Sequence, residues 1–302
     1  MQRPPRRWRF RRTFDAPAGQ PAPVRPRRTP TVSVIIPALN EARNLPHVFE
    51  RMPAVDEVVL VDGGSVDDTV AVARRLRPDI RVVTQNRTGK GNALACGFAA
   101  ATGDIIVMID ADGSTDPAEI PDFVAALRAG AHFAKGSRFA AGGGSGDITR
   151  VRRIGNRALN GLVNILFGTH YTDLCYGYNA FWAGCLRVFA LDITTPARAD
   201  GRKLWGDGFE IETLLNLHVA RAGLKVSEVS SFEHPRIHGT TNLCAVRDGL
   251  RVLATIAREW PRRNDVPAID TTRRAEVPAQ FAGTEHGQVE RLVGVHTDAV
   301  SK

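Results

Sequence analysis

Long apolar runs and paired cysteines are both missing from this sequence. No stretch reaches the roughly 18 consecutive apolar residues of a transmembrane helix. The basic N-terminus also lacks the apolar core of a secretory signal. The four cysteines, at positions 96, 175, 185 and 244, form no C-x-x-C pair. This spacing disfavours a disulfide framework or a zinc site, so we expect a protein of a reducing compartment, the cytoplasm.

A basic body is missing as well. The 302 residues hold 40 Lys and Arg against 32 Asp and Glu, a net charge of +8. Nine arginines and one acid, Asp15, fall within residues 1–30, which leaves 31 basic and 31 acidic side chains in the remainder. A neutral remainder disfavours nucleic-acid binding. The Arg- and Pro-rich residues 1–30 are expected to be disordered, either as a solvated tail or as one attracted to an anionic membrane surface.

Short apolar runs alternate with helical patterns over residues 31–135. The runs are rich in Val and Ile, as buried strands are. The alternation predicts an α/β fold with a mostly parallel central sheet flanked by helices. The expected strands lie at 32–36, 57–61, 80–84 and 105–109, and the expected helices at 41–51, 66–76, 90–101 and 117–128. Ser65-x-x-Asp68 and Asp116-Pro117 are start signals for the second and fourth helices.

The rest of the chain predicts one continuous domain with a tail. We expect residues 31–260 to form that domain and residues 261–302 to form a polar C-terminal tail. The glycine-rich residues 140–147 are expected to be a flexible loop, and the glycine run within it a mobile lid. The remaining predicted elements are an amphipathic helix at 150–167, helices at 208–222 and 243–259, and a strand at 224–230.

Polar clusters follow four of the predicted strands. They are residues 37–41 (Pro-Ala-Leu-Asn-Glu), 62–65 (Asp-Gly-Gly-Ser), 87–91 (Arg-Thr-Gly-Lys-Gly) and 110–113 (Asp-Ala-Asp-Gly). Each alone could be turn chemistry, because Asp and Gly are common turn residues. The carboxyl ends of parallel strands share one edge of a sheet, however, and ligands bind beyond that edge. The four clusters together therefore predict a binding crevice.

Two carboxylates in this crevice suit a hard cation. Asp110 and Asp112 lie one residue apart after a very apolar strand, and in a turn both could approach one Mg²⁺ or Mn²⁺ ion. The alternative is an ordinary cap and turn pair. Neither a G-x-G-x-x-G loop nor a P-loop is present. Gly89-Lys90-Gly91 opens a predicted helix, whose N-terminal amides could meet an anion.

These clusters resemble the nucleotide-sugar half of family-2 glycosyltransferases, which have the GT-A fold. Residues 136–139 (Gly-Ser-Arg-Phe), 173–181 and 236–239 (Arg-Ile-His-Gly) extend the likeness over about residues 31–260. They point to the branch that resembles dolichol- and polyprenyl-phosphate mannose or glucose synthases. The sequence departs from that pattern at Ser114, where such enzymes often carry a longer side chain near the metal.

The resemblance implies roles for individual donor-site residues. By this likeness the donor would be a nucleotide-diphosphate sugar, and Mg²⁺ or Mn²⁺ would sit at its diphosphate. The implied residues are Pro37, Leu39, Glu41 and Asp62 at the base and ribose, Lys90 and Arg236 among the other substrate contacts, and Asp110 and Asp112 at the diphosphate and metal.

The resemblance also implies an acceptor-phosphate site. Arg138 and an arginine of the 150–153 cluster would hold the phosphate, with Arg152 favoured and Arg153 beside it. A guanidinium fork suits a phosphate well. The alternative for the cluster is a solvated helix start, although cations there oppose the helix dipole, which favours an external anion.

The leading hypothesis is therefore an inverting, metal-dependent hexosyltransferase acting on polyprenyl phosphate. Asp112, Arg138 and Arg152 would be its catalytic residues. It would be cytoplasmic and peripheral at the inner membrane face, with the 150–167 helix near the bilayer unless that helix merely packs on the sheet. A lipid phosphate is already anionic, so this reaction needs no strong base.

Two other functions stay open. The first is a soluble glycosyltransferase acting on a saccharide or small-molecule hydroxyl, which would need a carboxylate base. Asp207, Glu210 and Glu212 are the candidates, unless they only cap a helix. The second is a nucleotide-sugar-binding scaffold without catalysis, which the intact Asp110-Ala111-Asp112 sequence disfavours.

Overall fold

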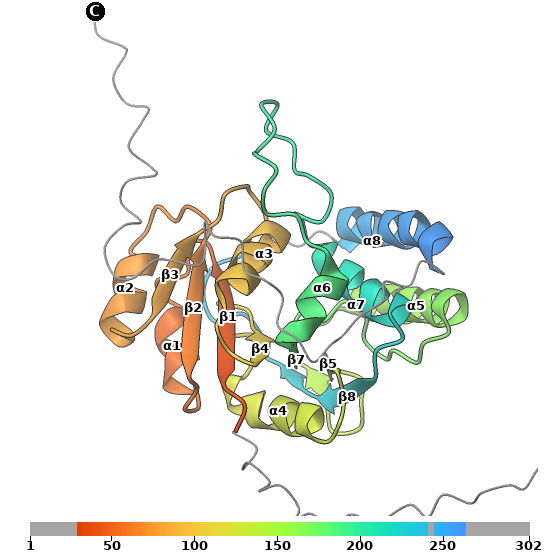
Figure 1. Ribbon diagram of the computed structural model, residues 1–302, viewed down its shortest axis with the longest axis horizontal. Coiled ribbons are helices and arrows are strands. Elements are labelled where there is room, and N and C mark those ends of the chain that lie inside the picture. The colour runs from red at the N-terminus through yellow and green to blue at the C-terminus, as the bar shows by residue number, and fades with distance from the viewer. Residues whose placement is uncertain (1–28, 241–244, 264–302) are drawn as a thin grey trace, which may run out of the picture.

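A seven-stranded sheet forms the centre of the molecule (Figure 1). The computed structural model describes residues 29–240 and 245–263, so most of both predicted tails lies outside the described residues. The strand order is β3-β2-β1-β4-β7-β5-β8. The strands are β1 (Val32–Ala38), β2 (Glu57–Asp62), β3 (Arg81–Thr84), β4 (Ile105–Met108), β5 (Phe133–Ser137), β7 (Asn179–Trp182) and β8 (Val226–Ser230).

The sheet is mixed but mostly parallel, as the sequence predicts. β1 pairs in parallel with β2 and β4, β2 with β3, and β5 with β8. β7 runs antiparallel between β4 and β5. The apolar pattern of the sequence did not indicate β5 or β7, whereas the four predicted N-terminal strands and the late strand are all present.

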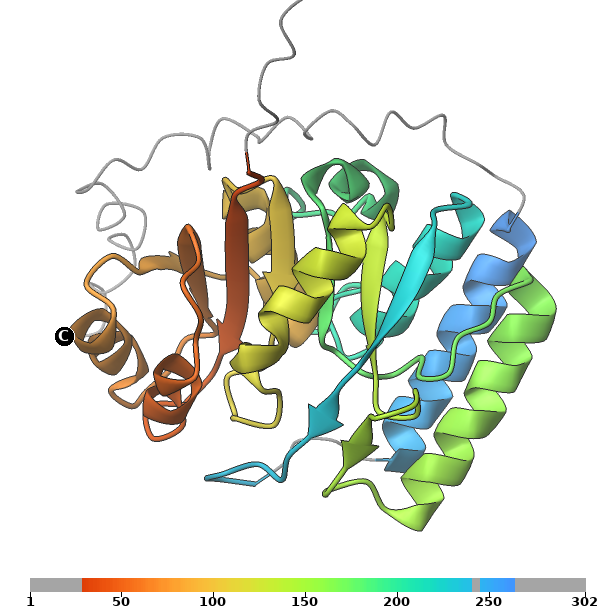
Figure 2. The same cartoon turned by 90° about the horizontal axis from the view of Figure 1, so that it is seen from below.

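Helices cover both faces of the sheet (Figures 1 and 2). Apolar side chains of α1, α2 and α4 pack in one core with one sheet face, and those of α3, α6 and α7 pack in a second core with the other. α5 and α8 lie side by side at the β8 end and pack against α7. The helices are α1 (Leu45–Glu50), α2 (Thr69–Leu76), α3 (Lys90–Ala100), α4 (Ile120–Arg128), α5 (Arg150–Phe167), α6 (Leu186–Phe189), α7 (Ile211–Arg221) and α8 (Ala245–Glu259).

One of the two predicted helix starts is confirmed. The Asp116 side chain accepts the Ala118 amide at 2.9 Å and begins the 3₁₀ turn Pro117–Glu119 that leads into α4. The Ser65-x-x-Asp68 prediction was wrong. α2 starts at Thr69, and the Asp68 side chain makes no capping bond. Asp67 instead accepts the Thr69 amide at 3.0 Å.

The glycine-rich loop is paired rather than free. Gly144 and Ser145 form β6 (Gly144–Ser145), which pairs with β9 (Phe232–Glu233). The Ser145 hydroxyl also donates to Glu233. The expectation of a flexible loop over 140–147 was therefore wrong at β6. Glycine composition indicates backbone freedom but cannot show that a distant segment will pair with that backbone.

α5 has the bounds that the sequence predicts. The Thr149 hydroxyl accepts the Arg152 amide at 3.2 Å, and Gly168 ends the helix with φ of 66°. The face turned inward carries Asn156, Asn160 and Val163. Among the described residues, no helix is both long enough and apolar enough to cross a bilayer.

Replacing Gly97 of α3 with alanine tests how tightly the helix packs on the sheet. The new Cβ would lie 2.3 Å from Ile35 Cγ2 and 2.8 Å from Val61 Cγ2. We expect Gly97→Ala to lower the free energy of unfolding by about 1–3 kcal/mol in urea denaturation, because the packed core must be forced apart. The control is Gly155→Ala on α5, where no atom lies within 4 Å. At position 155 alanine should raise the free energy of unfolding by at most about 1 kcal/mol. An equal decrease of the free energy of unfolding in both variants would contradict the prediction.

Candidate active site

The polar clusters that predict a crevice meet at the carboxyl ends of β1, β2 and β4, an edge that we call the crevice. The parallel register places Ala38 beside Asp62, and the Gly63 amide donates to the Ala38 carbonyl at 2.8 Å. The two turns are tied again where the Ser65 hydroxyl accepts the Asn40 amide at 2.9 Å. The first two polar clusters of the sequence therefore lie next to each other at one edge.

Arg236 joins two of these clusters. Its guanidinium donates to Asp112 Oδ2 at 3.1 Å and to the Glu41 carboxylate. Its Nε donates to the His238 carbonyl at 2.8 Å. Asn44 fixes the same segment, because it donates to the His238 carbonyl at 3.1 Å and accepts the His238 amide at 2.9 Å. Three predicted site residues, Glu41, Asp112 and Arg236, thus meet in one ion-pair cluster.

A second ion-pair cluster surrounds Lys90. Its Nζ lies 2.6 Å from Asp110 Oδ1 and 2.6 Å from Glu212 Oε1. Burial lowers the pKa of Lys90, but the charges of Asp110 and Glu212 outweigh burial and raise that pKa above its usual value. Burial raises the pKa of Glu212, and Lys90 opposes this shift. Lys90 is therefore a firmly charged cation between two carboxylates.

Glycine at position 177 leaves room beside this second cluster. A Cβ there would lie 2.7 Å from Glu212 Oε1 and 3.1 Å from Lys90 Nζ. Any larger residue would press against the ion pair. The geometry therefore requires a small residue between Tyr176 and Tyr178.

Asp62 stabilises its own turn. Its carboxylate accepts the Gly64 amide at 3.2 Å and the Ser65 amide at 3.1 Å. Leu39 is half-exposed at the end of β1, and a Cβ on Gly63 would touch it at 3.3 Å. Pro37 is partly exposed within β1. These three predicted donor residues, Pro37, Leu39 and Asp62, line the same end of β1 and β2.

The glycines around Lys90 make room for a loop rather than an anion. A Cβ on Gly89 would lie 2.0 Å from the Asp207 carbonyl, and one on Gly91 would lie 1.8 Å from the Gly206 carbonyl. The Gly91 amide donates to the Asp207 carbonyl at 2.9 Å. That helix-terminal amide is therefore used within the protein, in contrast to the expectation from the sequence.

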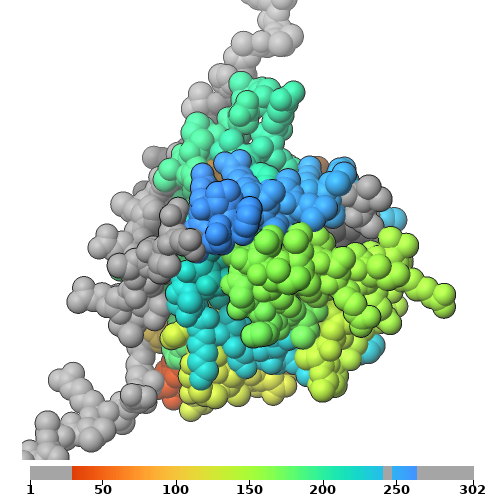
Figure 3. Space-filling view, turned by 90° about the vertical axis from the view of Figure 1, so that its right-hand side faces the viewer, coloured from red at the N-terminus to blue at the C-terminus, as the bar shows by residue number. Residues whose placement is uncertain are grey.

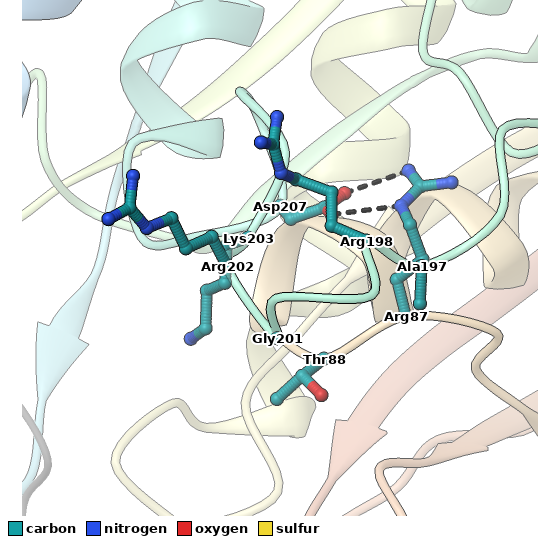
Figure 4. A pocket seen from close by; sticks show the side chains of 8 residues that line it. All are labelled: Arg87, Thr88, Ala197, Arg198, Gly201, Arg202, Lys203 and Asp207. Carbon is teal, nitrogen blue, oxygen red and sulfur yellow. Dashed lines mark hydrogen bonds and ion pairs between the residues drawn. The ribbon is translucent and has the colours of Figure 1, made fainter.

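A buried pair holds this loop in place (Figure 4). Arg87 Nε and Nη2 donate to the two Asp207 carboxylate oxygens at 2.9 and 2.8 Å. The remaining donors of Arg87 reach the carbonyls of Thr195 and Asp192. Arg198 and Lys203 line the small cavity of about 50 Å³ beside the pair.

Arg138 is buried between two acids. Its Nε lies 2.6 Å from Asp173 Oδ2, its Nη2 2.9 Å from Asp173 Oδ1, and its Nη1 3.0 Å from Glu233. The side chain is 4% exposed. The resemblance implies a direct contact with an acceptor phosphate, but in this structure the guanidinium is already committed to carboxylates. Sequence reasoning could not see these partners, which lie 35 and 95 residues away.

The arginines at the start of α5 are much less enclosed. Arg152 Nη1 donates to Asp147 Oδ2 at 3.0 Å, in a pair whose Asp147 side chain is about half-exposed. Arg153 is exposed and lines a groove beside α5. One short segment joins this region to the crevice. Glu233 binds Arg138, and three residues later Arg236 binds Asp112.

Comparisons with known proteins place the chain in a family. The sequence model of glycosyl transferase family 2 matches residues 33–191, more than half of the chain. The chain is 32% identical over 239 residues to the glycosyltransferase AglJ of Haloferax volcanii, a match that covers 77% of this chain and 73% of AglJ. The chain belongs to glycosyl transferase family 2.

Two further proteins similar to this family-2 glycosyltransferase are named for the products that they form. It is 37% identical over 174 residues to the polyprenol monophosphomannose synthase of Mycolicibacterium smegmatis, covering 53% of this chain and 64% of that protein. A crystal structure of glucosyl-3-phosphoglycerate synthase from Mycobacterium tuberculosis, in complex with Mn²⁺, UDP and glucosyl-3-phosphoglycerate, has a TM-score of 0.58 and 26% identity. That match covers 79% of this chain and 81% of the other, and it confirms the GT-A-like fold.

The two candidate metal ligands, Asp110 and Asp112, each form an ion pair with a basic side chain in the glycosyltransferase. In residues 29–240 and 245–263, no three His, Cys, Asp or Glu side chains gather in a way that could hold a metal ion. Asp110 and Asp112 supply two carboxylates, and Ser114 uses its amide to donate to Asp112 Oδ1 at 3.0 Å. Two carboxylates fit a hard cation whose remaining ligands come from phosphate oxygens and water.

Two of the three candidate bases of the glycosyltransferase have structural partners. Asp207 pairs with Arg87, and Glu210 accepts the amides of Gly206 and Gly208 at 3.1 Å each. Glu212 alone of the three lies in the Lys90 cluster. Glu212 was a candidate from the sequence because it lies near the start of a predicted helix. The other two acids, Asp207 and Glu210, met the same criterion, so the sequence could not select Glu212.

Breaking the Arg87–Asp207 pair should destabilise the glycosyltransferase. We expect Arg87→Gln to lower the free energy of unfolding by about 3–5 kcal/mol, because Asp207 would be left buried without its counterion. Arg198→Gln is the matched control, since within the described residues the Arg198 side chain pairs only with the exposed Asp200. It should change stability by less than about 1 kcal/mol. Urea denaturation measures both, and a similar small loss in each variant would argue against a fixing role for the pair.

Proposed function

We propose that this glycosyltransferase transfers a hexose from a nucleotide-diphosphate sugar to a polyprenyl phosphate, with inversion at the anomeric carbon. The observation that supports this most is the pairing of two carboxylate–cation clusters at the carboxyl edge of the sheet, Glu41–Arg236–Asp112 and Asp110–Lys90–Glu212. Similarity to a polyprenol monophosphomannose synthase supports the acceptor class.

The donor would lie along the ends of β1, β2 and β4. Pro37, Leu39, Glu41 and Asp62 would contact the base and ribose. Asp110 and Asp112 would hold Mg²⁺ or Mn²⁺, which when bound neutralises charge on the departing nucleoside diphosphate. Lys90 and Arg236 would add fixed positive charge next to the same phosphates.

The acceptor phosphate would lie near the first turn of α5. Arg152 has one half-exposed partner, Asp147, and could exchange it for a phosphate at small cost. Arg153 adds a second exposed guanidinium. Arg138 would act as a positioning residue, because it ties the Asp173 loop and the Glu233 strand together beneath that turn. Attack by a phosphate oxygen releases no proton, so this reaction needs positioning more than a base.

Removal of Asp112 tests the proposed reaction directly. The wild-type protein with Mn²⁺ or Mg²⁺, a panel of nucleotide sugars and a polyprenyl phosphate should form a lipid-phosphate sugar detectable by mass. We expect Asp112→Ala to lower product formation at least about 100-fold, since charge stabilisation of the leaving group is lost. Asp122→Ala, at an exposed acid of α4, is the control. Equal turnover in the two variants would remove Asp112 from the chemistry.

A hydroxyl acceptor is the second candidate function. The structural likeness to glucosyl-3-phosphoglycerate synthase favours it. Such a reaction needs a base, and Glu212 is the candidate that lies in the crevice. Its raised pKa, which is due to burial, is suitable for accepting a proton.

The response of Glu212→Gln to the acceptor type separates the two functions. If the acceptor is a hydroxyl, the rate should fall about 100- to 10,000-fold with the donor KM little changed, because a general base has been lost. If the acceptor is a phosphate, the rate should fall by the same factor for every acceptor tested. This fall should be accompanied by a higher donor KM, because Lys90 has lost its partner Glu212. Glu210→Gln is the comparison variant, and product formed only from hydroxyl acceptors would move the conclusion to the second function.

A further inference from the structure

A groove of about 370 Å³ runs along one side of α5. α5 supplies one wall, and Phe139 and residues 171–172 supply the other. The groove lies next to the Arg138–Asp173 pair, because its lining residues Phe139 and Thr172 are the chain neighbours of that pair. Of the residues that line the groove, only Arg153 has a substrate role in the proposed function.

The groove presents two arginines with no partner among the described residues. The other polar side chains of the groove already have hydrogen-bond partners. Asn160 binds Thr172 and Leu174, and Asn164 binds Tyr171 and Thr169. Tyr171 binds Asn216, and Thr172 binds Ser137 and Glu228. The side chains of Arg153 and Arg157, one turn apart on α5, have no hydrogen bond or ion pair in the described part of the chain. A concave site with two free guanidiniums fits an anionic oxygen group such as a phosphate.

An exposed apolar face borders the groove. On α5 the side chains of Val151, Ile154 and Ile165 are 70%, 70% and 83% exposed, and they follow one another along the outer side of the helix. α8 lies against α5, and the two helices share one face of the molecule (Figure 3). Leu250 and Leu253 of α8 are also exposed, at 61% and 43%. Apolar side chains gathered in this way on adjacent helices usually mark an interaction surface.

The exposed charged side chains on α5 and α8 themselves are all positive. α5 contains no acidic residue. Both acids of α8, Asp248 and Glu259, are buried. The exposed charged side chains of the two helices within the described residues are Arg150, Arg153, Arg157, Arg247 and Arg258. Apolar helix faces edged by arginines are typical of helices that lie on anionic bilayers.

We propose that the α5–α8 face docks on an anionic membrane and that the Arg153–Arg157 groove receives the phosphate of a bilayer lipid headgroup. Val151, Ile154, Ile165, Leu250 and Leu253 enter the boundary between headgroups and acyl chains. This docking does not rest on the proposed reaction, because any anionic phospholipid supplies the headgroup and no sugar transfer is involved. It places the first turn of α5, and with it Arg152, at the membrane surface.

Vesicle sedimentation with the full-length protein tests the docking. The probes are vesicles of phosphatidylcholine alone and of phosphatidylcholine with phosphatidylglycerol, at low and high salt. We expect binding to the anionic vesicles only, weakened by salt. The double variant Arg153→Gln/Arg157→Gln should bind them on the order of tenfold or more weakly. Ile154→Ser/Ile165→Ser should also lose binding, and circular dichroism checks that both variants are folded.

The matched control removes the same charge elsewhere. Arg74→Gln/Arg75→Gln changes two exposed arginines of α2, at the opposite end of the sheet from α5 (Figure 1). All variants keep residues 1–30, so any contribution of that segment is equal. Equal weakening in the two arginine variants would overturn the proposal, as would unchanged vesicle binding in both.

Two further outcomes would assign the face differently. Loss of inorganic phosphate binding in Arg153→Gln/Arg157→Gln, with vesicle binding retained, would make the groove a site for a free phosphate. A change of oligomeric state in Ile154→Ser/Ile165→Ser, with vesicle binding retained, would make the face a contact between copies of the chain. Either result overturns the docking. Failure of sugar transfer in the Asp112 experiment would leave it untouched.

Discussion

The structure of the crevice depends on the neutralisation of crowded carboxylates. The parallel register of β1, β2 and β4 brings Glu41, Asp110 and Asp112 to one edge of the sheet, where like charges would repel. Lys90 from α3 and Arg236 from the segment after β9 supply the compensating cations. The carboxylates can approach each other only because α3 and this segment are held beside them. In the proposed function the same cations would supply the positive charge that a diphosphate requires, so stability and donor binding would share one set of ion pairs.

The helices and strands that could be predicted are those in which the apolar positions of the sequence are the buried positions of the structure. The Val- and Ile-rich runs became β1, β2 and β4, and α5 has the bounds that its pattern indicates. β5 could not be predicted because it contains Lys135, a fully buried lysine whose Nζ donates to the Tyr176 carbonyl at 3.3 Å. β6 and β9 are two-residue strands formed by pairing between distant segments, and no local pattern is long enough to indicate them.

The candidate site could be predicted in composition but not in pairing. The rule for parallel sheets correctly brought the polar clusters to one edge. It could not show that Arg236 would reach back 195 residues to Glu41, or that Lys90 would lie between Asp110 and Glu212. Arg138 shows the limit most clearly. An arginine in a motif indicates a cation. Whether that cation is free to bind a ligand depends on its partners, and these come from distant parts of the chain.

Burial divides the arginines of this protein into two groups with different roles. Arg87 and Arg138 are enclosed with all their charge paired, so removing either leaves a buried acid and damages the fold. Arg152, Arg153 and Arg157 lie on an open helix where one half-exposed acid is the only described partner. Binding an external anion costs these side chains little. α5 is anchored at its second turn by the Asn156 bond to Asp173, which itself holds Arg138. A contact along the outer side of α5 is therefore linked to the crevice, because Arg138 also binds Glu233, three residues before Arg236.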